Sequence, residues 1–213
     1  MSEWVNYFEE TNRTLFMQCL RLRRLIELII RHTPEGGRIL EVGCGTGSLS
    51  LLLDDYGFEV TASDISREVL DYARKKTNRV ETKLKFVQAD LLNLSYAFKK
   101  KQFDTVCHKG VMEHFNDKDI VTGLGEQRKI ARKVIFHVPN NRQKTTNDLF
   151  GDERLLSNRK WVKLIMEAGF TDVRVFGDYD LQKCTYILPA VFLRPKLSFW
   201  WKYLSKHSVF VCK

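Results

Sequence analysis

The sequence predicts an α/β fold in which one mostly parallel sheet is covered by helices on both faces. Two observations predict it. From residue 39 onward, short apolar runs alternate with longer segments whose apolar residues recur every three or four positions. The first apolar run also enters a glycine-rich turn, ILEVGCGTG, that leads straight into a helical segment. The 213 residues, 44% hydrophobic and 29% charged, suit a single globular domain with elaborations.

Seven runs are expected to form strands. Each is short and rich in apolar and β-branched residues, as are strands buried on both faces of a parallel sheet. The last two runs have no clear helix between them, which predicts an antiparallel pair at the edge of the sheet. The runs are residues 39–42, 58–63, 83–89, 103–107, 133–138, 171–176 and 208–212.

Five segments are expected to be helical. Ser66 and Ser157 are suitable N-caps, and Gly57 and Gly169 are suitable helix ends. The segment that carries Gly123 and Gly125 is the weakest of the five, because glycine disfavours a helix interior. The segments are residues 13–32, 46–56, 66–76, 117–131 and 157–168.

The charge balance favours an anionic partner. Lys and Arg number 35 against 26 Asp and Glu, a net charge of +9, which attracts nucleic acid, a membrane surface or an acidic small molecule. From Leu181 to Lys213 there is no acid, and six basic residues alternate with aromatic and aliphatic ones. This tail fits a lid over an apolar acceptor, a surface for anionic lipid, an RNA-binding surface or a packed edge with a solvated basic face.

The cysteines point to a reducing compartment. The five cysteines are an odd number, and no two have C-x-x-C spacing, which argues against a disulfide framework and a zinc site. The first ten residues carry acids and no basic region, so no signal peptide is expected. The longest apolar stretch, residues 185–193, is too short to cross a bilayer. We therefore expect a cytoplasmic protein with no transmembrane segment.

The glycine turn predicts a nucleotide site. Gly43, Gly45 and Gly47 lie between a buried strand and a helix, where they permit a tight turn and a close approach of ligand to backbone. The helix N-terminus that follows offers unpaired N–H groups to a carboxylate or phosphate. The dinucleotide pattern G-x-G-x-x-G would need a third glycine where Ser48 stands, and no Gly-Lys-Ser/Thr follows for a Walker loop.

Two acids end the next two strands. Asp64 can accept both ribose hydroxyls of an adenosine. Asp90 can accept from an adenine amino group, while the backbone N–H of Leu91 reaches a ring nitrogen. Each acid has a simpler explanation, because Asp64 can cap a helix and Asp90 can form a turn. Together with the glycine turn, they predict one elongated adenosine ligand.

With these residues in place, the sequence resembles the class I S-adenosylmethionine-dependent methyltransferases, and is similar to those of ubiquinone and menaquinone biosynthesis. The resemblance covers residues 35–177 and the last strand, and includes FDTVCHKGVMEHF, VIFHVPN and WVKLIMEAGFTDVRVFG. It implies a Rossmann-like, seven-stranded sheet whose last strand is antiparallel. It also implies one domain over residues 1–213, with an N-terminal helical cap (about 1–33) and a basic aromatic insert (about 178–207).

The resemblance implies S-adenosylmethionine as cofactor and S-adenosylhomocysteine as product. The amino-acid end would lie at the glycine turn, the ribose at Asp64 and the adenine at Asp90 and Leu91. The full set of cofactor-binding residues implied in this way is Glu41, Gly43, Cys44, Gly45, Gly47, Asp64, Ile65, Asp90, Leu91 and Lys109.

The expected chemistry is an in-line displacement at the methyl group, for which the protein mainly supplies position and a dry site. A general base is needed where the acceptor must lose a proton. We name His114 and His137 as candidates, with His108 and Glu113 nearby. His137 also fits a buried, hydrogen-bonded strand histidine, and Glu113 and His114 also fit a loop-holding role.

A metal is not expected. Some RNA 3′-end and quinone methyltransferases bind a metal through E-x-x-E-H, but Gly110 stands in place of the first acid. The N/D-P-P-Y/F signature of enzymes that methylate amino groups is also missing. Trp4, Tyr7 and Phe8 are expected either to fold over the cofactor or to pack in the core. We expect a small-molecule acceptor, with an RNA-directed enzyme or a non-catalytic binding module as alternatives.

Overall fold

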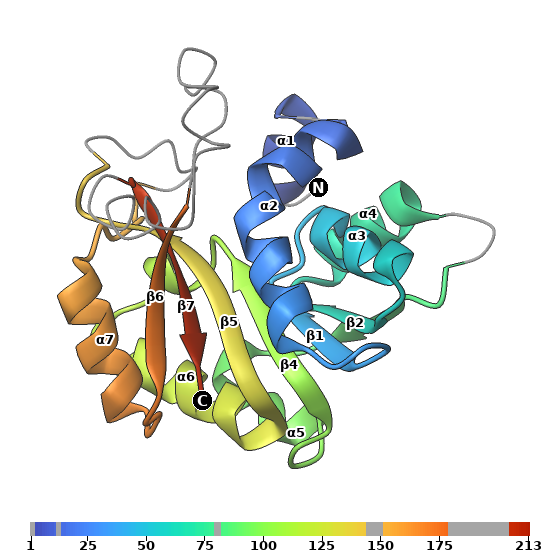
Figure 1. The fold of residues 1–213 in the computed structure, drawn as a ribbon. Coiled ribbons are helices and arrows are strands. Elements are labelled where there is room, and N and C mark those ends of the chain that lie inside the picture. The colour runs from blue at the N-terminus through green and yellow to red at the C-terminus, as the bar shows by residue number, and fades with distance from the viewer. Residues whose placement is uncertain (1–2, 12–13, 79–81, 144–150, 179–204) are drawn as a thin grey trace, which may run out of the picture.

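The described part of the chain forms one seven-stranded sheet with helices on both faces (Figure 1). A computed structural model describes residues 3–11, 14–78, 82–143, 151–178 and 205–213. The order of the strands is β3-β2-β1-β4-β5-β7-β6. All neighbours are parallel except β7, which runs antiparallel to both β5 and β6. This confirms the predicted Rossmann-like sheet.

All seven strands lie where the apolar runs predict them. The third is the shortest, with four residues instead of the expected seven, and half of its residues face solvent. The strands are β1 (Arg38–Val42), β2 (Glu59–Asp64), β3 (Lys85–Gln88), β4 (Phe103–Lys109), β5 (Ala131–Pro139), β6 (Val173–Asp178) and β7 (His207–Cys212).

The helices include four elements that no periodicity in the sequence predicts: α1, η1, α5 and η2. The first carries Trp4, Tyr7 and Phe8, so these aromatic residues lie on a helix of their own. The other three span three or four residues each, too few for an apolar repeat. The helices are α1 (Glu3–Glu10), α2 (Leu15–His32), α3 (Ser48–Tyr56), α4 (Arg67–Thr77), η1 (Leu91–Asn93), α5 (Leu94–Ala97), η2 (Met112–His114), α6 (Asp117–Ile130) and α7 (Asn158–Glu167).

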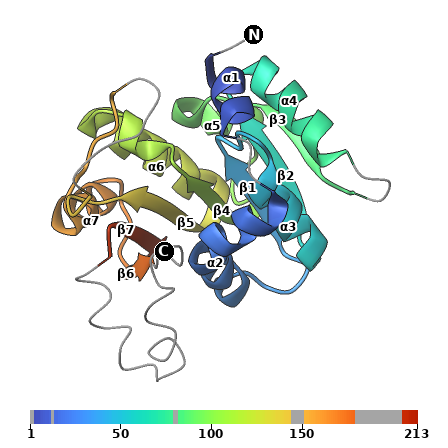
Figure 2. The same cartoon turned by 90° about the horizontal axis from the view of Figure 1, so that it is seen from above.

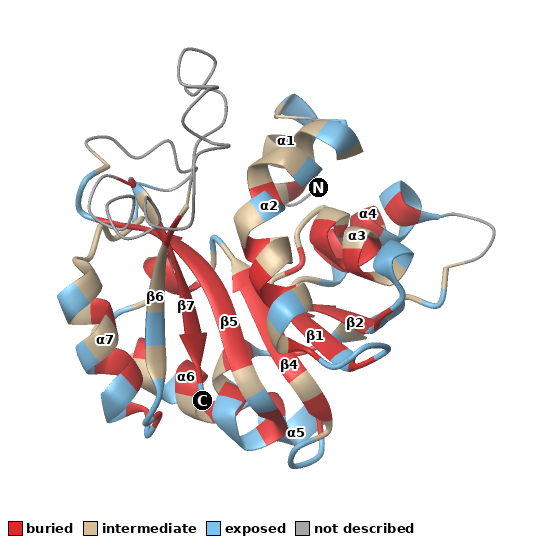
Figure 3. Ribbon diagram, viewed as in Figure 1, coloured by how far each residue is buried: buried red, intermediate tan, exposed pale blue. Residues whose placement is uncertain are grey.

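One face of the sheet is covered by α2, α3 and α4. Leu25 and Ile29 of α2 and Leu53 of α3 are fully buried against β1, β2, β4, β5 and β7 (Figure 3). Leu70 and Ala73 of α4 pack on β2. Along each strand alternate side chains reach this face, which is why Ile39 and Leu40 belong to different clusters.

The other face is covered by η1, α5, α6 and α7. Trp161 of α7 is fully buried and contacts Phe136 of β5 edge to face, with ring centroids 5.8 Å apart. Gly123 lies inside α6 because a Cβ there would come within 3.1 Å of Leu91 Cγ. The glycine therefore lets α6 pack closely on η1, and α6 forms despite the weak helix propensity of this segment.

The ends of the basic aromatic insert meet the sheet at β6 and β7. Asp178 is the last residue of β6 and His207 the first of β7. Residues 179–204, which form most of the expected insert, lie outside the described residues. Among the helices that are described, none has the length and apolarity needed to cross a bilayer.

Replacing Trp161 with Ala should lower the free energy of unfolding by about 3–5 kcal/mol, because it removes a large side chain from a closed core. Met166→Ala on the same helix is the matched control. Its side chain is 58% exposed, so the loss should stay within about 0.5 kcal/mol. Urea unfolding followed by far-ultraviolet circular dichroism measures both, and equal losses would contradict the packing described for α7.

Candidate functional site

Three of the sequence-predicted segments meet at one edge of the sheet. The glycine turn, Asp64 and Asp90 follow β1, β2 and β3, whose carboxyl ends are adjacent. Neighbouring strands are about 4.8 Å apart, so three adjacent tips span roughly 10 Å. On its other side β1 pairs with β4, and the strand order reverses there. Ligands of open α/β sheets bind at such a reversal.

The turn after β1 requires glycine at three positions. Gly43, Gly45 and Gly47 have φ values of 65°, 52° and 71°, a left-handed conformation that costs other residues about 1–2 kcal/mol each. At Gly43 there is also no room for a side chain, because a Cβ would lie 2.6 Å from Val111 Cγ2. The turn therefore needs glycine at Gly43 both for its conformation and for the close packing of Val111.

The glycine turn is covered by α1. A Cβ at Gly45 would lie 3.0 Å from Phe8 Cζ, so the Phe8 ring rests on the backbone of the turn. The same ring stacks on Tyr72 of α4, at 6.2 Å between centroids. Figure 2 shows α1 beside α4. The aromatic residues of α1 thus do two things named as alternatives from the sequence: they pack on α4, and they cover the predicted cofactor loop.

Glu41 is a buried carboxyl beneath the turn. It accepts hydrogen bonds from the backbone N–H of Ser50, at 2.8 Å, and from the Ser50 hydroxyl. It therefore satisfies an unpaired donor in the first turn of α3. Burial raises the pKa of Glu41 to about 8, and the hydrogen bonds from Ser50 only partly oppose this.

Asp64 connects the glycine turn to the start of α4. Its Oδ1 accepts from Ser66 N at 3.0 Å, and its Oδ2 accepts from Gly45 N at 3.4 Å. Burial raises its pKa, and these backbone hydrogen bonds oppose the rise. The carboxylate is thus turned toward the glycine turn, where it can reach a ligand lying across the tips of β1 and β2.

Other predicted cofactor-binding residues lie around the same edge. Asp90 is exposed and accepts from Leu92 N at 2.9 Å, which starts η1. Leu91 is buried against α6 and Ile65 is 65% exposed. Cys44 is buried, with its N–H on Ser63 O. Lys109 is the last residue of β4, and its positive charge opposes the rise that burial causes in the pKa of Glu41.

His137 is held in a buried polar cluster. Its Nε2 lies 2.7 Å from Asp178 Oδ2, and both side chains are less than 10% exposed. Its ring also stacks on that of His207, with centroids 5.1 Å apart. Burial lowers the pKa of His207 to about 4. His137 is thus a buried, hydrogen-bonded strand histidine, which is one of the two alternatives that the sequence left open.

His114 is the more accessible of the two named histidines. Its Nδ1 lies 2.6 Å from Asp152 Oδ1, its side chain is 18% exposed, and its ring meets that of Trp4 edge to face. The neighbouring Glu113 is buried, and its Oε2 has no hydrogen-bond partner among the described residues. Burial raises the pKa of Glu113 to about 7. Residues 112–114 form η2, so this pair also shapes the loop after β4.

His108 lies in the core. It is fully buried and stacks on Phe136, at 4.9 Å between ring centroids. Neither ring nitrogen has a hydrogen-bond partner in the part of the chain that the structure describes. Burial lowers its pKa to about 3. The sequence could have predicted the burial of His108, because His108 is two residues after the buried Val106 and points to the same face of the sheet.

Sequence reasoning missed Asp152, Asp178 and Ser50. Asp178 ends a strand just as Asp64 does, so the same rule could have found it. Ser50 is the third residue after Gly47 and lies in the first turn of α3. Its backbone N–H has no partner within the helix, so it can donate to a nearby carboxylate such as Glu41. Asp152 lies in a loop with no periodic pattern, 38 residues from the histidine it contacts. No signal in the sequence links that pair.

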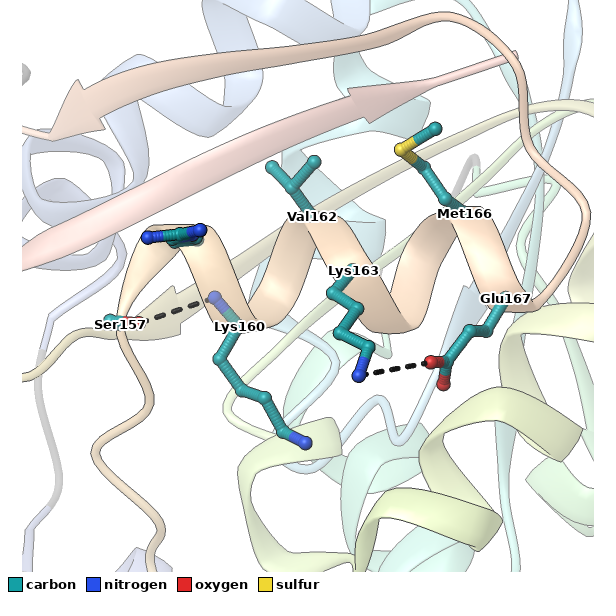
Figure 4. A pocket seen from close by; sticks show the side chains of 7 residues that line it. Ser157, Lys160, Val162, Lys163, Met166 and Glu167 are labelled. Atoms are coloured by element: carbon teal, nitrogen blue, oxygen red, sulfur yellow. Dashed lines mark hydrogen bonds and ion pairs between the residues drawn. The ribbon is translucent and has the colours of Figure 1, made fainter.

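A depression of about 780 Å³ lies on the outer side of α7, away from the glycine turn (Figure 4). Lys163 and Glu167, which line this depression, pair at 3.7 Å. None of the lining residues belongs to the predicted site: they are Ser157, Arg159, Lys160, Val162, Lys163, Met166 and Glu167.

Among the described residues, no group of three or more His, Cys, Asp or Glu side chains is arranged to hold a metal ion.

Comparisons with known proteins show what the residues around this site are similar to. The family described as "Methyltransferase domain" matches residues 39–133, from β1 to the start of β5. The demethylmenaquinone methyltransferase of Thermus thermophilus is 31% identical over 123 residues, which are 55% of this chain and 53% of that protein. The ubiquinone biosynthesis O-methyltransferase of Vibrio atlanticus is 30% identical over 161 residues, 75% of this chain and 60% of that protein.

From β1 to the start of β5 the chain is therefore similar to methyltransferases. A solved S-adenosylmethionine-dependent methyltransferase from Archaeoglobus fulgidus has the same fold, with a TM-score of 0.69, 16% identity and 100% coverage of both chains. The chain spans between 53% and 60% of the length of the two curated relatives. S-adenosylmethionine, the cofactor that the sequence resemblance implies, is named in the description of that solved protein.

The residues at the strand tips fit that cofactor. At Gly43 and Gly45 the absence of a Cβ leaves room for the side chains of Val111 and Phe8, which pack directly on the turn. The N-terminus of α3 favours a carboxylate, and the half-buried Asp64 carboxylate is an acceptor of the kind that a ribose needs.

Gly43→Ala should weaken binding of S-adenosylhomocysteine at least about 10-fold, because the Cβ adds a collision with Val111 to the strain of a positive φ. Gly36→Ala is the control. Gly36 has a similar φ of 63°, but nothing lies within 4 Å of a Cβ there, so it should cost about 1–2 kcal/mol of stability and leave binding unchanged. Calorimetry that finds both variants binding like wild type would argue against this turn as the cofactor loop.

Glu41→Gln should flatten the dependence of stability on pH. The pKa of Glu41 is raised from 4.5 to about 8 in the folded state. The contribution of protonated Glu41 to the free energy of unfolding is therefore complete below about pH 4.5 and is lost as the pH rises through about 8. The free energy of unfolding falls by at most about 1.4 kcal/mol per pH unit in this range. Glu113 acts in the same direction and remains in the variant. Urea unfolding at several pH values measures the slope, and an unchanged slope would mean that Glu41 is not buried as described.

Proposed function

We propose that this methyltransferase transfers the methyl group of S-adenosylmethionine to a small-molecule acceptor. The observation that carries the cofactor half is the Asp64 carboxylate, held by Gly45 N and Ser66 N at the tip of β2. The acceptor half is supported by the relatives, two of which are named for menaquinone and ubiquinone metabolites.

Each tip of the sheet would hold one part of the cofactor. When bound, S-adenosylmethionine supplies an activated methyl group on a positively charged sulfur. The turn at Gly43, Gly45 and Gly47 and the start of α3 would bind the amino-acid end. Asp64 would accept from the ribose hydroxyls, with Ile65 beside it. Asp90 and Leu91 would bind the adenine, while Glu41, Cys44 and Lys109 would support the turn and the crevice.

We favour His114 over His137 as the general base. The Nε2 of His137 is engaged by a buried carboxylate, and its ring is covered by His207. His114 is engaged through Nδ1 only and is partly exposed beside Trp4. A base must reach the proton that it abstracts, so the exposed ring is better placed than the enclosed one.

The two basic clusters at the starts of β4 and β5 do not favour RNA as the acceptor. Lys99 and Lys100 precede β4, and Arg128 and Arg132 flank the start of β5. They therefore lie at the amino ends of the strands, opposite the tips that carry the glycine turn. The insert through which RNA or anionic lipid contact was expected falls mostly outside the described residues.

Asp64→Ala should weaken S-adenosylmethionine binding by about 1.5–3 kcal/mol, or more than 10-fold, because it removes a charged hydrogen-bond acceptor. Asp71→Ala is the control, since Asp71 makes only exposed ion pairs with Arg67 and Arg74 on α4. Titration calorimetry should show wild-type affinity for Asp71→Ala. No binding by wild type, or equal binding by both variants, would contradict the proposed cofactor site.

The acceptor class can be tested with S-adenosylmethionine labelled in its methyl group. We expect label in the small-molecule fraction of a cell extract and none in total RNA. Label in RNA, with binding that weakens steeply as salt rises, would favour the RNA-directed alternative. Cofactor binding without label in any fraction would favour a binding module.

A further inference from the structure

We propose that Asp152 is a positioning residue that holds His114 in the tautomer required of a general base, and that the acceptor group is a hydroxyl. This inference rests on the proposed function of the site at the tips of β1 to β4. Neither the glycine pattern nor the strand-end acids assign any role to Asp152, which the fold brings to His114 from the loop after β5.

The contact itself fixes which nitrogen carries the proton. An ionised carboxylate can only accept, and Asp152 Oδ1 lies 2.6 Å from Nδ1 of His114. A neutral His114 therefore donates from Nδ1–H to Asp152, and its lone pair is left on Nε2.

The loop that carries Asp152 is fastened to the segment that carries His114. Arg154 N donates to Glu113 O at 2.9 Å, and Arg154 Nη1 donates to Phe115 O at 2.6 Å. Arg154 Nη2 also pairs with Asp117 Oδ1 at 2.7 Å. These contacts lie on both sides of His114 in the sequence, so the carboxylate is held at the ring by its surroundings as well as by its own hydrogen bond.

The pair lies close to the cofactor loop. The His114 ring meets Trp4 at 6.0 Å between centroids, and Trp4 stacks on Phe8 at 5.9 Å. Phe8 in turn rests on Gly45. His114 is therefore connected to the glycine turn through the rings of Trp4 and Phe8. Val111, one residue before η2, also contacts Gly43.

A base in this place serves an acceptor that must lose a proton. The proton of the acceptor hydroxyl passes to Nε2 of His114, and an oxygen electron pair forms the bond to the methyl carbon. The sulfur–methyl bond breaks and its electron pair stays on sulfur, which becomes a neutral thioether. A neutral amine can attack before it loses a proton, so a carboxylate-oriented base points to a hydroxyl instead.

Nitrogen-15 NMR of histidine-labelled protein tests the proposal on the full chain without any acceptor. At about pH 9, above the ordinary pKa of imidazole, His114 of the wild type should be the Nδ1–H tautomer. Asp152→Ala should lose that tautomer and show mostly Nε2–H, and Asp152→Glu, which keeps the carboxylate, should restore it. The signal is assigned by its absence in His114→Gln, among the five histidines of the chain.

Glu167→Gln is the matched control, because it removes a partly exposed carboxylate that pairs with Lys163 and no histidine. It should leave the tautomer unchanged. An Nε2–H tautomer in the wild type, or no change in a folded Asp152→Ala, would overturn the proposal. Calorimetry with S-adenosylmethionine on the same samples keeps the two proposals separate: a wild type that does not bind refutes the cofactor site, whereas the tautomer reports on Asp152 alone.

Discussion

The turn between β1 and α3 is the constraint on which the site depends. Three glycines with positive φ reverse the chain within five residues, and the closest neighbours of Gly43 and Gly45 leave no space for a side chain. The turn places the start of α3 directly after β1, the strand beside which the strand order reverses. Asp64 then reaches back to Gly45 N, so the second strand tip is joined to the first.

Burial sets the electrostatics around this turn. It raises the pKa of Glu41 to about 8 and that of Glu113 to about 7. Two histidine–carboxylate pairs lie at the same end of the sheet but in different surroundings, since the His137 pair is enclosed and the His114 pair is partly exposed. The same chemical motif is thus suited to holding strands together in one case and to proton transfer in the other.

The sequence predicted the sheet, and the meeting of the glycine turn, Asp64 and Asp90 at one edge, well because both rest on local patterns. Apolar runs mark the strands, and positions at strand ends become neighbours in space whenever the strands are parallel and adjacent. The prediction was weaker where tertiary contacts decide. Gly123 reads as a helix breaker until its contact with Leu91 is known, and α5 is too short for any periodicity. Asp152 meets His114 through a contact 38 residues apart that no local pattern encodes.

The most direct test is a crystal structure of the protein with S-adenosylhomocysteine. We expect the adenosine to lie across the carboxyl ends of β1, β2 and β3, with its ribose hydroxyls on Asp64 and its amino-acid group at the glycine turn. A ligand bound elsewhere, or a ribose that does not contact Asp64, would contradict the proposed cofactor site.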